Sequence, residues 1–220
     1  MSGAEIMGDS VLNKKAVILF AILFWLMIII ISYFHWDIAI AYYCKKELSG
    51  TVRDIAQIIT VWGDAKWYYG LLIIAFIIVY FIMKNKLFTR RVIYILFSLI
   101  TTGIVNTAIK WLAGRHRPKN LFNHDLYGFS FFGVGYELTS FPSGHTSVVF
   151  CIATAISMLF PRLCIPVFIT ALIIGMSRVI ITSHFLGDVI GGAGVGIIAA
   201  VVVKYYFNQK KIVLRENDGK

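Results

Sequence analysis

Six long apolar runs divide this sequence, and they constrain its fold more than any other feature. Each run is close to the ~17–25 residues that an α-helix needs to cross a bilayer. A helix in lipid satisfies its own backbone hydrogen bonds, which an open strand cannot do. The sequence therefore predicts an all-α fold, an integral membrane bundle of six transmembrane helices at residues 16–34, 67–83, 92–112, 143–160, 163–181 and 185–207.

Composition agrees with a membrane protein that forms one domain. Hydrophobic residues make up 59% of the 220 residues, whereas soluble domains contain roughly 45–50%. The net charge of +10 does not indicate a nucleic-acid partner, because the cations are scattered between apolar runs. Three cysteines form no disulfide framework. We expect a single membrane-embedded domain over residues 1–220, with the bilayer as its surroundings.

The first apolar run has a second interpretation, a cleaved signal peptide. Lys14 and Lys15 precede the run, and residues 39–41 resemble a cleavage site. The run is longer than the ~7–15 residues of a signal core. An uncleaved membrane anchor is therefore the better interpretation.

Two segments outside the runs are more polar. Residues 35–66 carry Arg53, Asp54 and Gln57 among apolar side chains, which predicts amphipathic helices in the membrane interface. Residues 208–220 form a polar tail, and we expect 210–220 to be disordered.

The distribution of lysine and arginine predicts the orientation, because cytoplasmic loops carry an excess of both. With the N-terminus inside, twelve such residues fall on inner segments and nine on outer ones. The bias becomes twelve to six when the polar set described next is set aside. Both termini are therefore expected in the cytoplasm, with 35–66 outside and 208–220 inside.

A set of polar residues lies at the ends of the apolar runs, where ionised groups are expensive. A charge at the bilayer centre costs at least ~2.5–3.5 kcal/mol. In the predicted orientation these residues all fall on the outer face, at the ends of four spans. They are Lys110, Arg117, Ser143, Gly144, His145, Arg178, His184 and Asp188. We expect them to line one active site at the outer membrane face.

The residues Pro142-Ser143-Gly144-His145 stand where a predicted helix begins. Serine is a frequent N-cap, so a capped helix with an incidental histidine is one interpretation. The other is an anion site, because the first amides of a helix are free and its dipole is positive there.

His184 and Asp188 are four residues apart, which places them on one helix face. A carboxylate that accepts the proton of one imidazole nitrogen leaves the other nitrogen free as a nucleophile or base. A helix-stabilising polar pair and a zinc site are the alternatives. The spacing lacks the His-Glu-x-x-His pattern of zinc enzymes, so no metal is expected.

Lys110, Arg117 and Arg178 supply positive charge beside the histidines. Each alone would be explained by a long side chain reaching the interface. Together they suit a phosphate, because the guanidinium fork matches two phosphate oxygens.

The motifs have a recognisable spacing. Lys110 is followed by six residues and Arg117-Pro118, then by Pro142-Ser-Gly-His145, then by Ser177-Arg178, five residues, His184, three residues and Asp188. This pattern resembles the three-part signature of the type 2 phosphatidic acid phosphatase superfamily, the lipid phosphate phosphatases. The resemblance covers the motifs from Lys110 to Asp188 and, through the six spans, nearly the whole chain.

The resemblance implies three catalytic residues. His184 would attack phosphorus and become a transient phosphohistidine, and Asp188 would orient it. His145 would protonate the leaving group and then activate water. Charge on the phosphate oxygens would be neutralised by Lys110, Arg117, Ser143, Gly144 and Arg178, without a metal or other cofactor.

The loop at 113–141 is ~29 residues long, which is unusual for a loop without a function. We expect this active-site loop to fold over the pocket and contact the substrate. Glu137 and His116 are candidates for supporting roles. In the last span, Gly187, Gly191, Gly192 and Gly196 predict close helix packing against the fourth span.

The expected function is a lipid phosphatase in a bacterial plasma membrane, with an extracytoplasmic active site. The small size resembles the bacterial phosphatidylglycerophosphate phosphatase type, which serves phosphatidylglycerol synthesis. Undecaprenyl pyrophosphate, a carrier for cell wall synthesis, is the alternative substrate, and phosphatidic acid comes next. A vanadium haloperoxidase has a comparable anion pocket but is expected to be soluble. A lipid or phosphate transporter is disfavoured, because transporters place their sites near the midplane.

Overall fold

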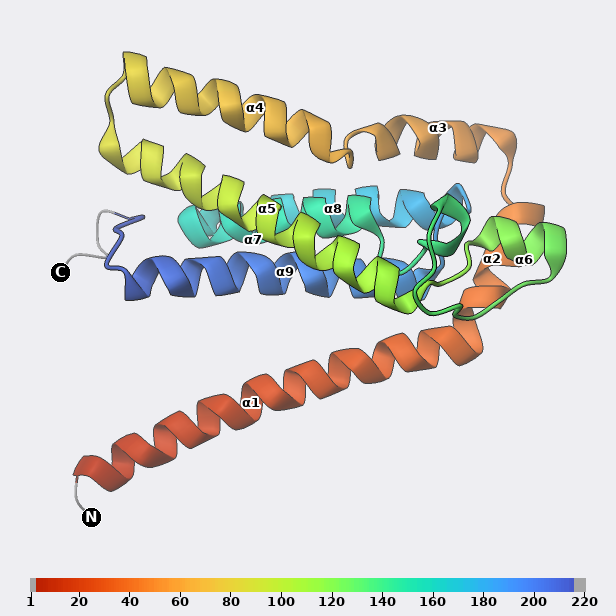
Figure 1. Ribbon diagram of the computed structural model, residues 1–220, viewed down its shortest axis with the longest axis horizontal. Coiled ribbons are helices and arrows are strands. Elements are labelled where there is room, and N and C mark those ends of the chain that lie inside the picture. The colour runs from red at the N-terminus through yellow and green to blue at the C-terminus, as the bar shows by residue number, and fades with distance from the viewer. Residues whose placement is uncertain (1–2, 216–220) are drawn as a thin grey trace.

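The computed structural model describes residues 3–215, with side chains from residue 16 onward, and it is an assembly of helices without strands in that range (Figure 1). The all-α prediction is confirmed. The long helices are α1 (Gly3–Ile31), α4 (Ala65–Ile77), α5 (Lys86–Ala113), α7 (Gly144–Leu159), α8 (Cys164–Ile180) and α9 (Leu186–Gln209); shorter ones are α2 (Asp37–Lys46), α3 (Gly50–Val61) and α6 (Pro118–His124). Single π-helical turns at Ser32–Trp36 and Ile78–Ile82 extend α1 and α4.

Five helical segments of the described chain are long and apolar enough to cross a membrane. They are Ala16–Lys46, Gly50–Ile82, Lys86–Ala113, Pro161–Ile180 and Leu186–Gln209. The fourth predicted span, at 143–160, is α7, which has only 16 residues. The chain is therefore a multi-pass membrane protein, and the count of six crossing helices stays a prediction.

Local sequence explains where the helices begin and end. The side chains of Ser49, Asp64 and Asn85 each accept a hydrogen bond from a backbone amide in the first turn of α3, α4 and α5, as N-caps do. Gly114 ends α5 in the left-handed conformation, with a φ of 58°, which costs glycine little. This turn directs the chain from α5 into the 113–141 loop.

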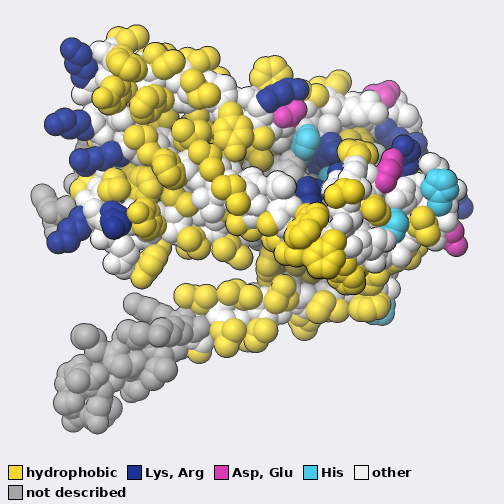
Figure 2. Space-filling view, in the orientation of Figure 1, with side chains coloured by type: hydrophobic (Ala, Val, Ile, Leu, Met, Phe, Trp, Pro, Cys, Tyr) yellow, Lys and Arg dark blue, Asp and Glu magenta, His cyan; other side chains and the backbone are white. Residues whose placement is uncertain are grey.

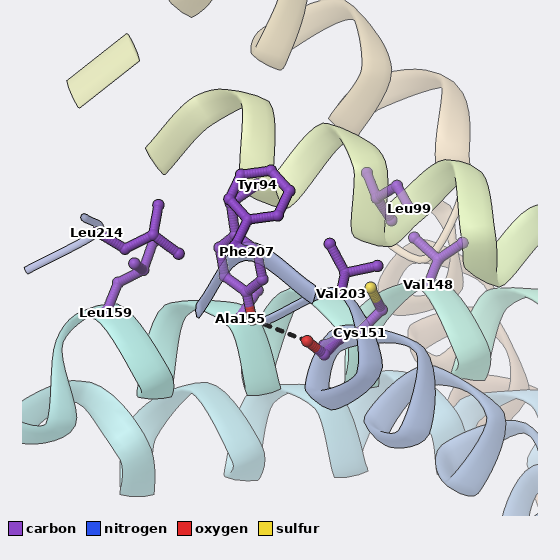
Figure 3. Close-up of a cluster of buried hydrophobic side chains, with 10 residues drawn as sticks. Tyr94, Leu99, Val148, Cys151, Ala155, Leu159, Val203, Phe207 and Leu214 are labelled. Atoms are coloured by element: carbon purple, nitrogen blue, oxygen red, sulfur yellow. Dashed lines mark hydrogen bonds between the residues drawn. The ribbon is translucent and has the colours of Figure 1, made fainter. Parts of the chain in front are cut away.

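The core lies where α5 and α9 pack around α7 (Figure 3). Tyr94 of α5 is fully buried there and donates a 3.1 Å hydrogen bond to the Ala200 carbonyl of α9. The two helices α7 and α9 approach closely at Gly192 and Gly196, where an added Cβ would meet the backbone of α7. The close packing predicted for these glycines is therefore present.

The segment at 35–66 contains two helices. The α2 helix continues α1 through the π-helical turn, and α3 packs along α8 before a turn at 62–64 leads into α4 (Figure 1). Its location in a membrane interface stays a prediction.

The predicted disorder of the tail is wrong for the residues just after α9. Leu214 is fully buried in the core, and Arg91 Nε donates a 2.9 Å hydrogen bond to its carbonyl. Residues 216–220 lie outside the described part of the chain.

Charged side chains gather at the two ends of the molecule, and an apolar band separates them (Figure 2). Lysines and arginines occupy the end that holds the α4–α5 turn and the last turn of α9. Histidines and acidic residues lie towards the opposite end, together with further lysines and arginines. This distribution suits a protein that crosses a bilayer along its long axis.

Candidate active site

The polar residues predicted from the sequence converge at one end of the bundle. The amide of Ser143, just before α7, donates a 2.9 Å hydrogen bond to the Asp188 carbonyl in the first turn of α9. The amide of His184 donates to the Arg178 carbonyl near the end of α8. Backbone contacts therefore join the ends of three helices around the candidate site.

Asp188 is fully buried and accepts hydrogen bonds on both carboxylate oxygens. Its Oδ2 atom accepts from the Phe185 amide at 2.9 Å and from Ser140 Oγ at 2.5 Å. Its Oδ1 atom accepts from Arg115 Nη1 at 2.6 Å. His184 Nδ1 lies 3.5 Å from Oδ2, which is longer than a normal hydrogen bond. The carboxylate is thus held in a fixed orientation that faces the histidine.

The second nitrogen of His184 faces a cation. Arg117 Nη1 lies 3.3 Å from His184 Nε2, and a guanidinium can only donate. The Nε2 atom must therefore carry its lone pair, which leaves the proton on Nδ1 beside Asp188. Burial lowers the pKa of His184 to about 3, although Asp188 opposes this shift. The ring is neutral at physiological pH.

Carbonyl groups hold two of the candidate phosphate-binding cations in place. Arg117 donates to the carbonyls of Tyr136, Ser183 and Thr139 at 2.7, 2.9 and 3.2 Å. Lys110 Nζ donates to the same Thr139 carbonyl at 2.5 Å. The active-site loop therefore fixes both side chains, and it places them next to each other.

The third cation, Arg178, lies on α8. Its Nη1 atom donates a 2.9 Å hydrogen bond to Thr60 Oγ1 of α3. Its Nε atom is buried without a partner among the described residues. A buried donor without a partner is costly, so this cation has spare capacity for an anionic ligand.

Ser143, Gly144 and His145 form the start of α7, as predicted. Ser143 Oγ is buried and accepts a 3.0 Å hydrogen bond from Thr146 Oγ1. The ring of His145 borders the turn between α3 and α4, since a Cβ added at Gly63 would lie 2.9 Å from its Cδ2 atom. The charged neighbours of this ring are Arg178, Asp64, Arg117 and Lys110.

Sequence reasoning missed two residues of this region, Asp37 and Arg115. Arg115 pairs with Asp188 on one side and with Asp37 on the other, where Nη2 lies 2.5 Å from Oδ2. Both side chains are at most 1% exposed. Asp37 lies just beyond the first apolar run, in the segment at 35–66 interpreted as interfacial, so the cost of a charge in lipid did not single it out.

The two candidates for supporting roles lie on the loop surface. Glu137 forms an exposed 2.9 Å ion pair with Lys119. His116 contacts Ser130 Oγ at 2.9 Å and Asn120 Nδ2 at 3.0 Å. In the described part of the chain these side chains brace the loop and do not contact His184 or His145.

We predict that Gly63→Ala disturbs His145. The new Cβ would stand 2.9 Å from both His145 and Ile174, so the imidazole must move. Misplacement of a reacting group by about 1 Å can cost ~10²-fold in rate, and we expect kcat to fall by about 10- to 100-fold. Gly70→Ala is the matched control, because nothing lies within 4 Å of its added Cβ. Equal phosphatase kinetics for the two variants would show that this turn does not position His145.

Comparisons with known proteins show the family to which this chain belongs. A family model described as PAP2 superfamily matches residues 91–212. A lipid A 1-phosphatase of Rhizobium etli is 28% identical over 161 residues, which cover 69% of this chain and 69% of that protein. Lipid phosphate phosphatase 2 of Arabidopsis thaliana is 29% identical over 160 residues, covering 57% of this chain and 54% of the plant protein.

Two solved structures share the fold. The PAP2 type phosphatidylglycerolphosphate phosphatase from Bacillus subtilis superimposes with a TM-score of 0.64 and 25% identity, covering 87% of this chain and 95% of that one. LpxE from Aquifex aeolicus gives a TM-score of 0.61 at 21% identity, covering 80% and 99%. The family match spans more than half of the sequence and includes every predicted motif. The chain is a member of the PAP2 superfamily of membrane lipid phosphatases.

Proposed function

We propose that this protein hydrolyses a lipid phosphate through a phosphohistidine intermediate. The observation that carries the proposal is the state of His184, whose Nε2 lone pair lies beside Arg117 while Nδ1 faces Asp188. A neutral imidazole, oriented by a carboxylate and placed next to a phosphate-binding cation, is equipped to attack phosphorus.

The reaction has two steps. In the first, His184 Nε2 forms a bond to phosphorus, the bond from phosphorus to the lipid oxygen breaks, and His145 gives its proton to that oxygen. In the second, His145 takes a proton from water, and the resulting hydroxide displaces the histidine to release inorganic phosphate. His184 and His145 thereby return to their starting states.

The cations carry out the electrostatic part of phosphoryl transfer, which depends mainly on positioning and charge. Lys110, Arg117 and Arg178 would bind the phosphate oxygens, with Ser143 and the Gly144 amide at the positive end of α7. These residues need no metal ion to neutralise the phosphate.

For location, we propose a bacterial plasma membrane with both termini in the cytoplasm. The cation-rich end at the α4–α5 turn then faces inward, as the positive-inside rule requires. The active site would lie at the outer surface and take its substrate from the outer leaflet.

Phosphatidylglycerophosphate is the substrate that we propose, and undecaprenyl pyrophosphate is the alternative. The B. subtilis structure supports the first by its name and its coverage of this fold. The R. etli relative adds the 1-phosphate of lipid A to the substrates worth testing. The residues of the site contact the phosphate and leave the rest of the lipid to the apolar surroundings.

The direct test is phosphate release by the purified protein in detergent with EDTA. We expect release from phosphatidylglycerophosphate, with kcat/KM higher than for undecaprenyl pyrophosphate, phosphatidic acid and lipid A. Turnover in EDTA would be retained because Lys110, Arg117 and Arg178 neutralise the phosphate. Absence of release from every lipid would contradict an enzyme and favour a transporter, and equal kcat/KM values would indicate a broad phosphatase.

A further inference from the structure

Behind His184 lies a second layer of charge, the buried ion-pair network of Asp37, Arg115 and Asp188. Arg115 Nη1 lies 2.6 Å from Asp188 Oδ1, and Nη2 lies 2.5 Å from Asp37 Oδ2. The three side chains are no more than 1% exposed. One guanidinium therefore bridges two carboxylates in the protein interior, and one of these carboxylates faces His184.

Both ends of the network are anchored. Asp37 Oδ1 accepts from Ser32 Oγ at 2.7 Å and from the Gly187 amide, in the first turn of α9, at 2.8 Å. Ser32 and Asp37 flank the π-helical turn at Ser32–Trp36. A wide turn of this kind changes the helix register, which here directs Asp37 towards α9. The N-terminal helix is thus attached to the turn that carries His184.

Aromatic rings surround the guanidinium of Arg115. Its centre lies 4.9–5.5 Å from the centroids of Tyr33, Tyr127, Phe129 and Phe185. Arg115 Nη2 also donates to the hydroxyl of Tyr127 at 3.1 Å. Rings at this distance attract a cation through their faces, so the guanidinium has little freedom to rotate.

We propose that Arg115 and Asp37 are positioning residues for the histidine nucleophile. Arg115 holds Asp188 by Oδ1, which leaves Oδ2 facing His184 Nδ1. Asp37 binds the other side of Arg115, so the charges sum to −1 (one guanidinium and two carboxylates) rather than to zero. The net negative charge keeps Asp188 an effective acceptor for the Nδ1 proton, and this makes Nε2 more nucleophilic.

Arg115 keeps its positive charge in the folded protein. Burial alone would lower the pKa of this guanidinium, but Asp188 and Asp37 together raise it above its ordinary value. The charged neighbours of His184 are Asp188, Arg117 and Lys110. Arg117 and Lys110 are cations on the side of the ring where the phosphate would bind. The network of Asp37, Arg115 and Asp188 supplies negative charge on the other side of the ring.

The inference rests on the proposed function, and its test separates the two. Wild type and variants are assayed in detergent on the lipid phosphate that the wild type hydrolyses best. We expect Arg115→Lys to lower kcat by about 10- to 100-fold with KM nearly unchanged, because the variant misplaces the nucleophile and leaves the phosphate clamp intact. Lys119→Gln is the control, since it removes a loop cation whose ion pair is exposed and weak.

A double-mutant cycle shows whether Arg115 acts through Asp188. In an Asp188→Asn background, Arg115→Lys should lower kcat less than about threefold further, because the group it positions is already lost. The full additional loss, or an unchanged kcat for Arg115→Lys alone, would overturn the inference. Should Arg115→Lys not fold, Asp37→Asn carries the same test, since it keeps the Arg115–Asp188 pair. Loss of folding in both variants would show that the network is only structural. An inactive wild type would contradict the proposed function instead.

Discussion

His184→Ala is expected to abolish phosphate release, with a loss of at least about 10⁴-fold in kcat, as removal of a covalent nucleophile typically causes. Nε2 is the buried imidazole nitrogen whose lone pair faces Arg117 Nη1 at 3.3 Å. Alanine supplies no atom there that could bond to phosphorus. The measurement is phosphate release in detergent, together with a search for acid-labile phosphoprotein after brief incubation with ³²P-labelled lipid.

His124→Ala is the matched control, because this histidine is exposed on α6, away from the candidate site. It should retain both turnover and the labelled intermediate. Turnover retained in His184→Ala would assign the nucleophile to another residue. Turnover lost together with a persistent labelled phosphoprotein would contradict the assignment in the same way.

The sequence singled out the candidate site residues because charges in apolar runs are costly and few. Lys110, Arg178 and Asp188 stand out against hydrophobic neighbours, so their positions alone pointed to a site. Their convergence could be inferred from the predicted topology, which put the ends of four spans on one face.

Asp37 and Arg115 were not predicted as site residues, and the reason is related. Asp37 lies in a segment interpreted as interfacial, where a charge costs little free energy. Arg115 lies in a loop, where cations are common. Their pairing crosses 78 residues, and no local spacing reveals it. The π-helical turn after α1 leads directly into α2, which begins at Asp37 and ends at Lys46, and Arg115 pairs with that first carboxylate. Hydropathy alone predicted that the first span ends at residue 34.

Hydropathy predicted the bounds of α7 to within one residue at each end, as the run at 143–160 and the helix Gly144–Leu159 show. The helix has 16 residues, which is about 24 Å at the usual rise and short for a helix that crosses a membrane. Its neighbours α5, α8 and α9 enclose it. A helix covered by protein does not have to match the full thickness of the hydrocarbon, so the site at its N-terminus can lie below the membrane surface.

His145→Ala should impair the first step of the reaction only when the leaving group needs a proton, and should impair the second step with every substrate. On a lipid phosphate, the leaving alkoxide needs a proton, and we expect kcat to fall by about 10²- to 10⁴-fold, the usual worth of a general acid. On p-nitrophenyl phosphate the leaving phenolate departs without a proton. The first step should then stay within about tenfold of wild type, while hydrolysis of the intermediate stops because no base activates water.

The variant should therefore release a burst of nitrophenolate equal to the enzyme concentration and accumulate phosphohistidine, measured by stopped-flow absorbance and acid-labile label. This outcome is the reverse of that for His184→Ala, which forms no intermediate with either substrate. Equal losses on both substrates without a burst would mean that His145 only shapes the pocket. Its ring borders the turn at Gly63 and has Asp64, Lys110, Arg117 and Arg178 as charged neighbours.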